Sequence, residues 1–437
     1  MRYEHYKPTH IPWLPEVPAH WEVRPYKSLY GFGKGLPITK ENLMESGIPV
    51  ISYGQIHAKE NTGVKLSNHL LRYVSPDYLR SHPNCLLVEG DMAIADTSED
   101  VEGCGNAVLM TYTEPVFAGY HTIIGRIKDK RQARYLAYVF LSDCWRAQVR
   151  SIVRGVKLFS ITKTILSSTH FPLPPRGEQE AIVAFLDERC GKVERLVAAK
   201  ERQVALLKEY KQRLIAEVVT RGLPGRQTSF KPSNIPWLPE VPAHWEVRRL
   251  KSLFTLRHEG YTEEEPLPVL SLLKDVGVIL YEEKGQIGNK CKEDFSSYNI
   301  ARKGDIVMNS MNVIIGSVGL SPYDGYISPA YYALIPAEGV IARYYDFLFH
   351  MAVVQQTMRS LAKGILEIRL RISTVNLFDM AFPLPPRGEQ EAIVAFLDER
   401  CEQVDEAVRK LEAEVAALKA YKQRLIADVV TGQRKVV

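Results

Sequence analysis

The sequence lacks the features that mark most secreted, membrane-spanning and metal-stabilised proteins. No segment approaches the roughly 18–20 uncharged apolar residues that cross a bilayer. The first ten residues, MRYEHYKPTH, contain no apolar stretch typical of a secretory signal. The six cysteines include no C-x-x-C pair, so the sequence predicts neither a zinc ribbon nor a redox motif. We therefore expect free thiols and a cytoplasmic protein.

Signatures of catalysis are missing as well. The stretch GFGKG at residues 31–35 lacks the Gly-Lys-Ser/Thr ending of a phosphate-binding loop. The sequence contains no H-E-x-x-H or G-x-S-x-G, no dinucleotide-binding glycine loop, and no Asn/Asp-Pro-Pro-Tyr/Phe of amino-methyltransferases. His20 and His244 have no partners nearby in the sequence that would make a metal site or a triad, so packing is the favoured role. We expect no catalytic residue, no metal and no cofactor in the chain itself.

What is present is a soluble-protein composition on a long chain. With 437 residues, 46% hydrophobic and 24% charged, the protein is long enough for two to four domains. The formal net charge of +5 permits a polyanionic partner but does not require one, because it is spread over the whole chain.

The dominant feature is an internal repeat. Residues 11–24 read IPWLPEVPAHWEVR, and residues 235–248 repeat these letters 224 positions later. Residues 171–190 read FPLPPRGEQEAIVAFLDERC and recur at residues 382–401, now shifted by 211. Each half thus contains an opening motif, a variable stretch, a PPRGEQ motif and a long apolar-periodic segment. The four repeated tryptophans are expected to anchor the opening motifs on their domains: Trp13, Trp21, Trp237 and Trp245.

The two variable stretches, about residues 25–170 and 249–381, differ in length by 13 residues but keep common anchors. Gly90-Asp91 matches Gly304-Asp305, and Arg134-Tyr135 matches Arg343-Tyr344. Drift after duplication would scatter changes over the whole unit, whereas here they concentrate in the middle. The pattern favours one fold used twice, with two different surfaces.

After each PPRGEQ motif the apolar residues alternate at spacings of four and three, a heptad seam. The first seam runs from Val193 to Val218 and the second from Val404 to Val429, and lysines interrupt both. About 42 residues of helix give a rod of roughly 60 Å. Matched seams favour antiparallel pairing of the two helices within one chain, and pairing with another protein or in a homodimer is the alternative.

This layout resembles the specificity (S) subunit of type I restriction–modification systems. The resemblance rests on the opening motif, on the Gly-Asp after a strand, and on PLPPRGEQEAIVAFLD at the start of each long helix, and it covers the whole chain. It implies two target-recognition domains that each bind half of a split double-stranded DNA sequence, and two modification subunits as partners. It further implies restriction subunits, with S-adenosylmethionine, ATP and Mg bound by the partner subunits.

We therefore predict a mixed α/β (α+β) fold: two globular target-recognition domains joined by two long antiparallel coiled-coil helices with pseudo-two-fold symmetry. The expected divisions are residues 1–175, 176–222, 223–386 and 387–437, in the order domain, helix, domain, helix.

DNA-binding candidates lie in loops that follow predicted strands, where forked donors and acceptors could contact bases or phosphates. One acidic cluster could hold a cation, but its copy at residues 309–316 has no carboxylate, so a loop surface is favoured for Asp96, Glu99, Asp100 and Glu102. In the first domain the candidates are Tyr53, Gln55, His57, Lys59, Thr97, Ser98, Arg154 and Lys157. In the second they are Lys274, Asn309, Ser310, Asn312, Lys363, Arg369 and Arg371.

Apolar residues on a second face of each helix start exceed what one helix partner covers. We expect them to dock a modification subunit, with burial against the recognition domain as the alternative: Ile182, Phe185, Leu186, Ile393, Phe396 and Leu397. Three other functions stay open: a coiled-coil scaffold, a stand-alone DNA-binding accessory protein, and a nuclease with dispersed carboxylates.

Overall fold

The computed structural model describes residues 2–155, 157–225, 228–274, 276–285, 294–311, 316–362 and 370–436. It divides into two compact units, residues 1–201 with 412–437 (unit 1) and residues 202–411 (unit 2). Each unit contains one variable stretch and a part of both long helices. Within the described part of the chain, every helix is too short or too polar to span a bilayer.

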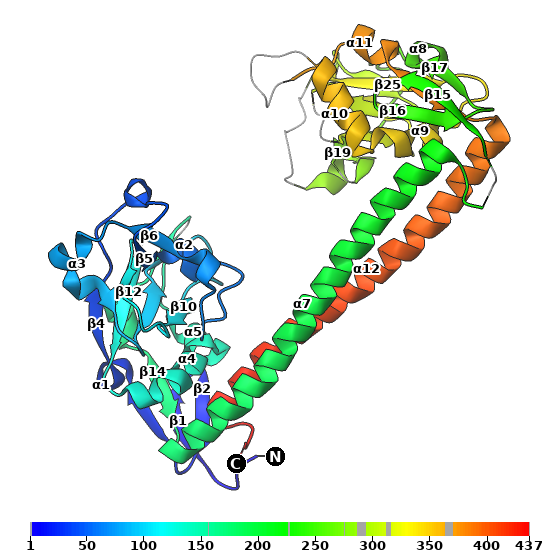
Figure 1. Cartoon of the computed structure of the whole chain (residues 1–437). Helices are drawn as coiled ribbons and strands as arrows, with labels where there is room; N and C mark the ends of the chain where they lie inside the picture. Colours follow the sequence, from blue (N-terminus) through cyan, green and yellow to red (C-terminus); the bar gives the residue numbers. More distant parts are fainter. Residues whose placement is uncertain are drawn as a thin grey trace. The chain divides into compact units, whose positions relative to one another are not determined.

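Unit 1 opens with a hairpin and continues into two four-stranded sheets (Figure 1). The hairpin is β1 (Tyr6–Ile11) and β2 (Leu14–Pro18). One sheet has the order β10 (Ala107–Leu109), β8 (Met92–Ala95), β12 (Thr122–Ile127), β4 (Tyr30–Lys34). The other has the order β6 (Arg72–Val74), β5 (Ile48–Ile51), β11 (Val116–Ala118), β7 (Leu86–Leu87).

Two short strand pairs and six helices complete the recognition domain of unit 1. The pairs are β3 (Glu22–Pro25) with β14 (His170–Leu173), and β9 (Thr97–Ser98) with β13 (Phe159–Ser160). The helices are α1 (Tyr26–Leu29), α2 (Tyr53–Ile56), α3 (Tyr78–Ser81), α4 (Ala133–Leu141), α5 (Asp143–Arg150) and α6 (Lys163–Ser167).

Unit 2 repeats the plan. Its hairpin is β15 (Phe230–Ile235) and β16 (Leu238–Pro242), and β17 (Glu246–Arg249) pairs with β26 (Ala381–Leu384). Its four-stranded sheet has the order β18 (Phe254–Leu256), β25 (Tyr331–Pro336), β22 (Ile306–Asn309), β23 (Val318–Leu320), which matches β4-β12-β8-β10 of unit 1.

The remaining strands of unit 2 form two pairs, β19 (Leu270–Leu273) with β20 (Gly277–Leu280) and β21 (Asn299–Ala301) with β24 (Gly325–Ile327). Its short helices are α8 (Leu250–Leu253), α9 (Ala342–Phe349), α10 (Ala352–Leu361) and α11 (Thr374–Asp379). The described residues thus confirm the predicted mixed α/β class in both halves.

The two long helices are α7 (Arg176–Arg221) and α12 (Arg387–Val430), and within each unit they run side by side and antiparallel (Figure 1). In unit 1, Lys200 pairs with Glu414 and Glu194 with Lys422. In unit 2, Lys211 pairs with Asp405 at 2.6 Å. Each lysine that interrupts a predicted seam therefore meets a carboxylate of the opposite helix. These pairs fix the register, and the predicted intramolecular pairing is confirmed.

Each unit has one main core, in which both long helices pack against the recognition domain. In unit 1, Ile182 and Leu186 are fully buried in this core, and in unit 2 Ile393 and Leu397 are fully buried in the same way. The prediction of an exposed docking surface is therefore wrong for these four residues, because the recognition domain covers that face of the helix. Phe185 and Phe396 are half-buried, each beneath an arginine side chain.

The two repeated motifs meet at one carboxylate in each unit. In unit 1, His20 Nε2 and Trp21 Nε1 both donate to Glu178 Oε2, at 2.9 and 3.1 Å. Trp21 is fully buried, and the Glu178 side chain is only 11% exposed. This contact joins the opening motif to the PPRGEQ helix start, so the variable stretch between them leaves from and returns to one place.

Unit 2 makes the same contact. His244 and Trp245 donate to Glu389 Oε2 at 2.8 and 3.1 Å. The two histidines thus have the structural role that the sequence favoured. The prediction that all four tryptophans anchor their motifs is wrong for Trp13, which is 50% exposed. It lies at the tip of the opening hairpin, where no core surrounds it.

We predict that Glu178→Ala lowers the free energy of unfolding of unit 1 by about 1–3 kcal/mol, because it leaves the buried Trp21 indole N–H without an acceptor. Denaturant unfolding of the whole chain measures the change. The matched control is Glu180→Ala, two residues along the same helix, where the carboxylate is exposed and pairs only with Arg176. Equal losses in the two variants would contradict the structural role of Glu178.

Candidate nucleic-acid interface

The Gly-Asp anchors form tight turns that aim the loops after them. Gly90 and Gly304 have φ of +91° and +94°, a backbone conformation that favours glycine. The Asp91 carboxylate accepts a hydrogen bond from the Val88 amide at 2.9 Å and pairs with Arg126. The Asp305 carboxylate accepts one from the Arg302 amide at 2.8 Å. The turns are therefore structural, and candidate DNA-binding residues begin only beyond them.

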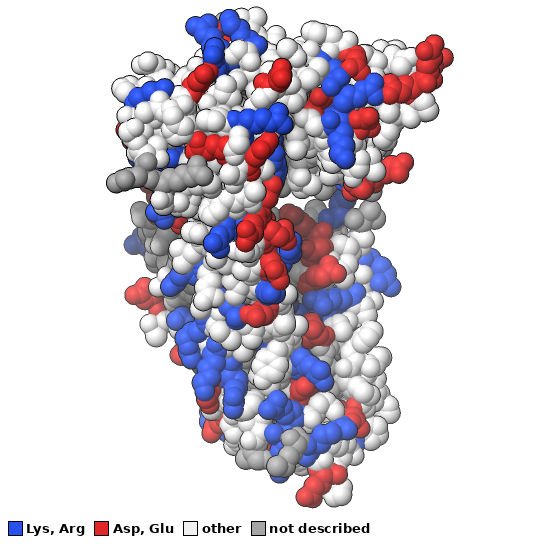
Figure 2. Space-filling view, turned by 90° about the vertical axis from the view of Figure 1, so that its right-hand side faces the viewer, with Lys and Arg blue, Asp and Glu red and all other residues white. Residues whose placement is uncertain are grey.

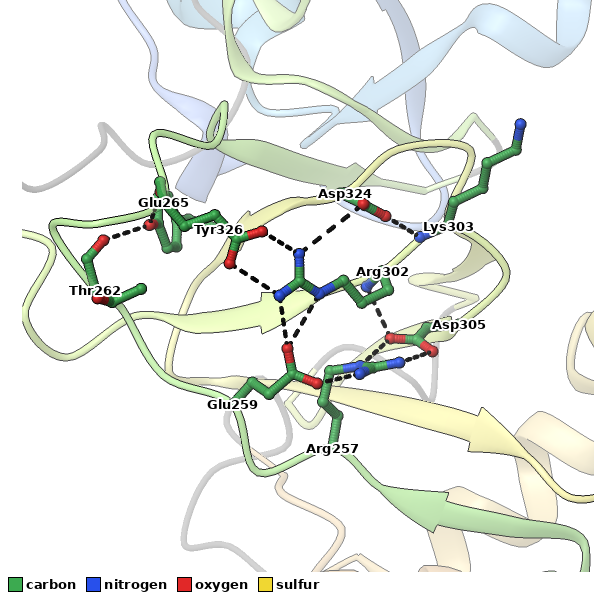
Figure 3. A network of polar contacts seen from close by, with 9 residues as sticks. All are labelled: Arg257, Glu259, Thr262, Glu265, Arg302, Lys303, Asp305, Asp324 and Tyr326. Atoms are coloured by element: carbon green, nitrogen blue, oxygen red, sulfur yellow. Dashed lines mark hydrogen bonds and ion pairs between the residues drawn. The ribbon is translucent and has the colours of Figure 1, made fainter.

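Different strands supply the cation for this buried aspartate in the two units. Arg126 comes from β12 in unit 1, whereas in unit 2 Arg257, next to β18, donates to Asp305 through Nε at 2.6 Å (Figure 3). The position that matches Arg257 in unit 1 is Gly33 on the paired strand β4, where an added Cβ would lie 3.3 Å from the Arg126 guanidinium. The buried aspartate thus has an arginine partner in both units, but the arginine comes from a different one of two neighbouring strands.

We predict that Arg126→Met lowers the free energy of unfolding by about 1–3 kcal/mol, because it leaves Asp91 as an unpaired buried charge. Chemical denaturation of the full chain tests this. Arg131→Met is the control, since Arg131 is exposed and its partner Asp129 is 34% exposed, whereas Asp91 is 5% exposed. Indistinguishable unfolding midpoints for the wild type and Arg126→Met would show that Asp91 does not need its cation.

Unit 2 extends this contact into a network. Arg302 pairs with Glu259 and Glu265, and Tyr326 Oη donates to the Thr262 carbonyl at 2.9 Å (Figure 3). Hydrogen bonds from Arg302 lower the pKa of both glutamates. These charges hold the loop after β18 against the sheet. Arg257 and Arg302 are therefore committed inside the protein and are poor candidates for phosphate contacts.

The predicted DNA-binding candidates of each unit fall into three groups along the chain, called places here: residues 53–59, 97–98 and 154–157 in unit 1, and residues 274, 309–312 and 363–371 in unit 2. In unit 1 the first two places come together. The His57 ring lies between Thr97 and Asn106: its Nε2 faces the Thr97 carbonyl at 2.9 Å, and its Nδ1 faces Asn106 Nδ2 at 3.0 Å. Both ring nitrogens are thus used inside the protein, so His57 positions the two loops and does not read bases. Tyr53 and Gln55 line the same cavity as Ser98, and the cavity has a volume of about 790 Å³.

The third predicted place lies beside the second. Strand β13 pairs with β9, and the Ile161 amide donates to the Asp96 carbonyl at 2.7 Å. Arg154 and Lys157, just before β13, are both exposed, as is Lys59. Thr97 Oγ1 donates to the neighbouring Asp96 at 2.7 Å, and Ser98 is buried. All three predicted places of unit 1 therefore converge on one surface.

Unit 2 agrees less well with the predictions. Asn309 and Ser310 are buried, and the Asn309 side chain accepts the Met311 amide at 3.1 Å, so neither presents a free edge to DNA. Lys274 and Arg371 are exposed, and the Ile372 amide donates to the Ser310 carbonyl at 3.1 Å, which brings the third place beside the second here as well. Asn312, Lys363 and Arg369 lie outside the described residues.

Sequence reasoning missed two residues at the unit 1 surface. His121 is exposed, has φ of +54°, and lies 3.2 Å from Asp96 Oδ1 with its ring 5.4 Å from that of Tyr53. Such backbone strain is concentrated at functional sites. Arg146, on α5, lines the cavity. Neither carries a local signal, because strand pairing and helix packing bring them to residues far away in the sequence.

Charge alone does not mark the interface. On the face shown in Figure 2, basic and acidic side chains are interspersed. Glu99, Asp100 and Glu102 line the unit 1 cavity. This position agrees with the prediction that the acidic cluster belongs to a loop surface. Among the described residues no group of three or more His, Cys, Asp or Glu side chains could hold a metal ion.

Comparison with known proteins identifies the family. The family model for the type I restriction modification DNA specificity domain matches twice, over residues 18–195 and 242–416. The chain belongs to this family. Each match includes one opening-motif tryptophan and one PPRGEQ motif, so the family domain corresponds to the repeat unit.

Relatives and solved structures agree with this assignment. The chain is 24% identical to the type I restriction enzyme MjaVIII specificity subunit of Methanocaldococcus jannaschii, over 83% of this chain and 86% of that one. It is 22% identical to the EcoBI specificity subunit of Escherichia coli, over 90% and 81% of the two chains. The chain is thus a type I specificity subunit by family.

Two solved structures share the fold at 18% identity. A structure from work on complex assembly and conformational transition of the type I R-M system gives a TM-score of 0.67, covering 95% of this chain and 98% of that one. The HsdS subunit from Thermoanaerobacter tengcongensis gives 0.50, covering 96% and 98%.

Proposed function

We propose that each unit binds one half of a bipartite double-stranded DNA site, and that the pairing of α7 with α12 sets the number of base pairs between the halves. The observation that carries this is the contrast inside each unit: the frame around Glu178 or Glu389 is identical, whereas the loops that follow the strands differ. Half-sites one turn of DNA apart are about 34 Å from centre to centre. Helices of 46 and 44 residues, roughly 65–70 Å long, suit such a separation.

In this proposal the chain itself is not catalytic. Two modification subunits transfer methyl groups to adenine N6 with S-adenosylmethionine, and restriction subunits use ATP and Mg to translocate and cleave DNA in the cytoplasm. A scaffold protein would have no use for two different surfaces on one frame. A nuclease would need a carboxylate site for a metal, and the described residues offer none.

Co-purification with a candidate modification subunit, followed by mapping of methylated adenines, tests the proposal. We expect a split, asymmetric sequence with a constant gap. A contiguous sequence, or methylation without sequence preference, would refute it. Magnesium-dependent cutting of a plasmid by the isolated chain would instead support the nuclease alternative.

We infer that Lys157 contacts a DNA phosphate, because it is exposed next to β13 on the surface where the three places meet. We predict that Lys157→Ala weakens DNA binding by the whole complex on every sequence and lowers the slope of log K against log salt by about 1. Lys410→Ala is the control, because Lys410 is exposed on α12 and pairs with Glu406. An unchanged salt slope for Lys157→Ala would show that Lys157 does not contact a phosphate.

The modification subunits cannot dock on the apolar residues that are buried in the two cores. Two glycines point instead to the starts of the long helices. Gly177 and Gly388 are the second residues of α7 and α12, and neither has a positive φ. A Cβ at either position would meet nothing within 4 Å. Glycine in a helix costs about 0.5–1 kcal/mol relative to alanine, so the fold alone favours alanine at both sites. Close approach of a modification subunit to each helix start explains why both copies keep glycine.

We predict that Gly177→Ala combined with Gly388→Ala leaves the isolated chain as stable or more stable, but weakens binding of modification subunits about tenfold or more through steric overlap. Gly191→Ala is the matched control: Gly191 also lies in α7, but its counterpart is Glu402, so a side chain is tolerated there. Titration of labelled modification subunit onto each variant measures the effect. Full affinity for the double variant would exclude docking at the helix starts.

A further inference from the structure

The cavity of unit 1 is built from six separate segments of the recognition domain. Its wall includes α2, the segment from Ser98 to Asn106, and Tyr120 after β11, and Arg146 of α5 contributes as well. A volume of about 790 Å³ lies in the range of ligand sites. A recess of this kind cannot enter a DNA groove. It can only receive a group that projects from the duplex.

Two amides in the cavity are fixed by the protein and still have one free atom each. The Gln55 Oε1 accepts the Ser52 amide at 2.9 Å, which leaves Nε2 as a donor. His57 Nε2 must donate to the Thr97 carbonyl, so its Nδ1 accepts from Asn106 Nδ2, which leaves Asn106 Oδ1 as an acceptor. Because these partners are unambiguous, the orientation of both amides is determined. A fixed donor and a fixed acceptor match the polar edge of a nucleobase.

Arg146 supplies a cation that forms no ion pair with a described side chain. Its Nε donates to the Phe140 carbonyl at 3.3 Å, and among the described residues its terminal amino groups have no hydrogen bond or ion pair. Burial, and secondarily the charge of Arg150, lower its pKa to about 10. Burial of a cation without an ion pair is costly, so a phosphate oxygen that reaches the Arg146 guanidinium would be stabilised. Lys40 and Arg72 add positive charge at the same cavity.

Aromatic rings and carboxylates complete the lining. The Tyr53 ring lies 5.7 Å from that of Tyr120 and 5.4 Å from that of His121. Aromatic faces stack on bases, and carboxylates such as Asp100 and Glu102 accept hydrogen bonds from the amino groups of cytosine. The lining therefore carries three cations and three carboxylates, which suits a ligand with both an anionic group and amino groups: Lys40, Arg72, Arg146, Glu99, Asp100 and Glu102. A nucleotide has both a phosphate and a base edge with such groups.

We propose that this cavity takes one nucleotide extruded from the first DNA half-site, with its phosphate toward Arg146 and its base edge toward Gln55 and Asn106. The proposal rests on the proposed function and adds a specific mode of readout to it. The residues that match Ser52–Gln55 in unit 2 are Ser271–Lys274; Ser271–Leu273 belong to strand β19 and Lys274 lies in the turn after it, so no helix forms there. The proposal accordingly concerns the first half-site.

The test uses the full chain with its modification subunits and duplexes that contain the mapped recognition sequence. In each duplex, one base of one strand is replaced so that a single pair is mismatched, while the other strand, from which the nucleotide would be extruded, keeps its sequence. Extrusion costs less from a mismatch, so we expect one position of the first half-site, other than the methylated adenine, to bind about tenfold or more tightly when mismatched. 2-Aminopurine at that position should gain fluorescence on binding.

The variants are Gln55→Glu, which keeps the Ser52 contact but removes the free donor, and Tyr53→Leu, which removes the aromatic face. We expect both to reduce the mismatch gain to threefold or less, whereas Glu60→Ala, on the same loop but outside the cavity, keeps the gain. The absence of such a position, or a gain unchanged in both cavity variants, would overturn the proposal. A methylation pattern that is not bipartite would instead overturn the proposed function, so the two failures are distinguishable.

Discussion

One carboxylate in each unit, Glu178 or Glu389, accepts hydrogen bonds from the histidine and the buried tryptophan of an opening motif more than 140 residues earlier. A buried indole N–H needs an acceptor, and a nearly buried carboxylate needs donors. Their hydrogen bond therefore avoids the free-energy cost of leaving either group unsatisfied. This contact brings the start and the end of a variable stretch together at the start of a long helix. Everything between these points can change without moving the frame.

The long helices connect this frame to the spacing of the two halves. Their seams contain lysines at positions where apolar residues would pack equally well, and each of these lysines meets a carboxylate of the other helix. A shift of one heptad would separate all of these pairs at once. The ion pairs therefore select one antiparallel register, which is a known use of polar residues in coiled coils.

Much of this follows from the sequence, because repeats, heptads and Gly-Asp turns are local patterns. The two-fold repetition, the helices, their pairing and the structural histidines could all be predicted. The docking residues could not, because a heptad pattern does not show that the recognition domain covers the second face at Ile182 and Leu186. Asn309 has a polar side chain in a predicted loop, but its burial depends on strand packing.

The cavity of unit 1 also contains residues whose roles could not be predicted from the sequence. Tyr53, Gln55 and Ser98 could be proposed because they follow strands, but their convergence depends on a histidine that bonds across 40 residues of sequence. His121 and Arg146 carry no local signal at all. Their roles arise from a strained turn and from a cation without an ion pair at the cavity wall, and only the folded chain contains either.

The most direct test of the central claim, that a constant frame carries independent DNA-binding stretches, is to replace residues 25–170 by residues 249–381 of the same chain. Both units then carry the same variable stretch within unchanged motifs. Mapping of methylated adenines by the complex with modification subunits should give a palindromic sequence, in which the second half-site occurs twice in inverted orientation at the original gap. An asymmetric sequence, or a changed gap, would contradict the account.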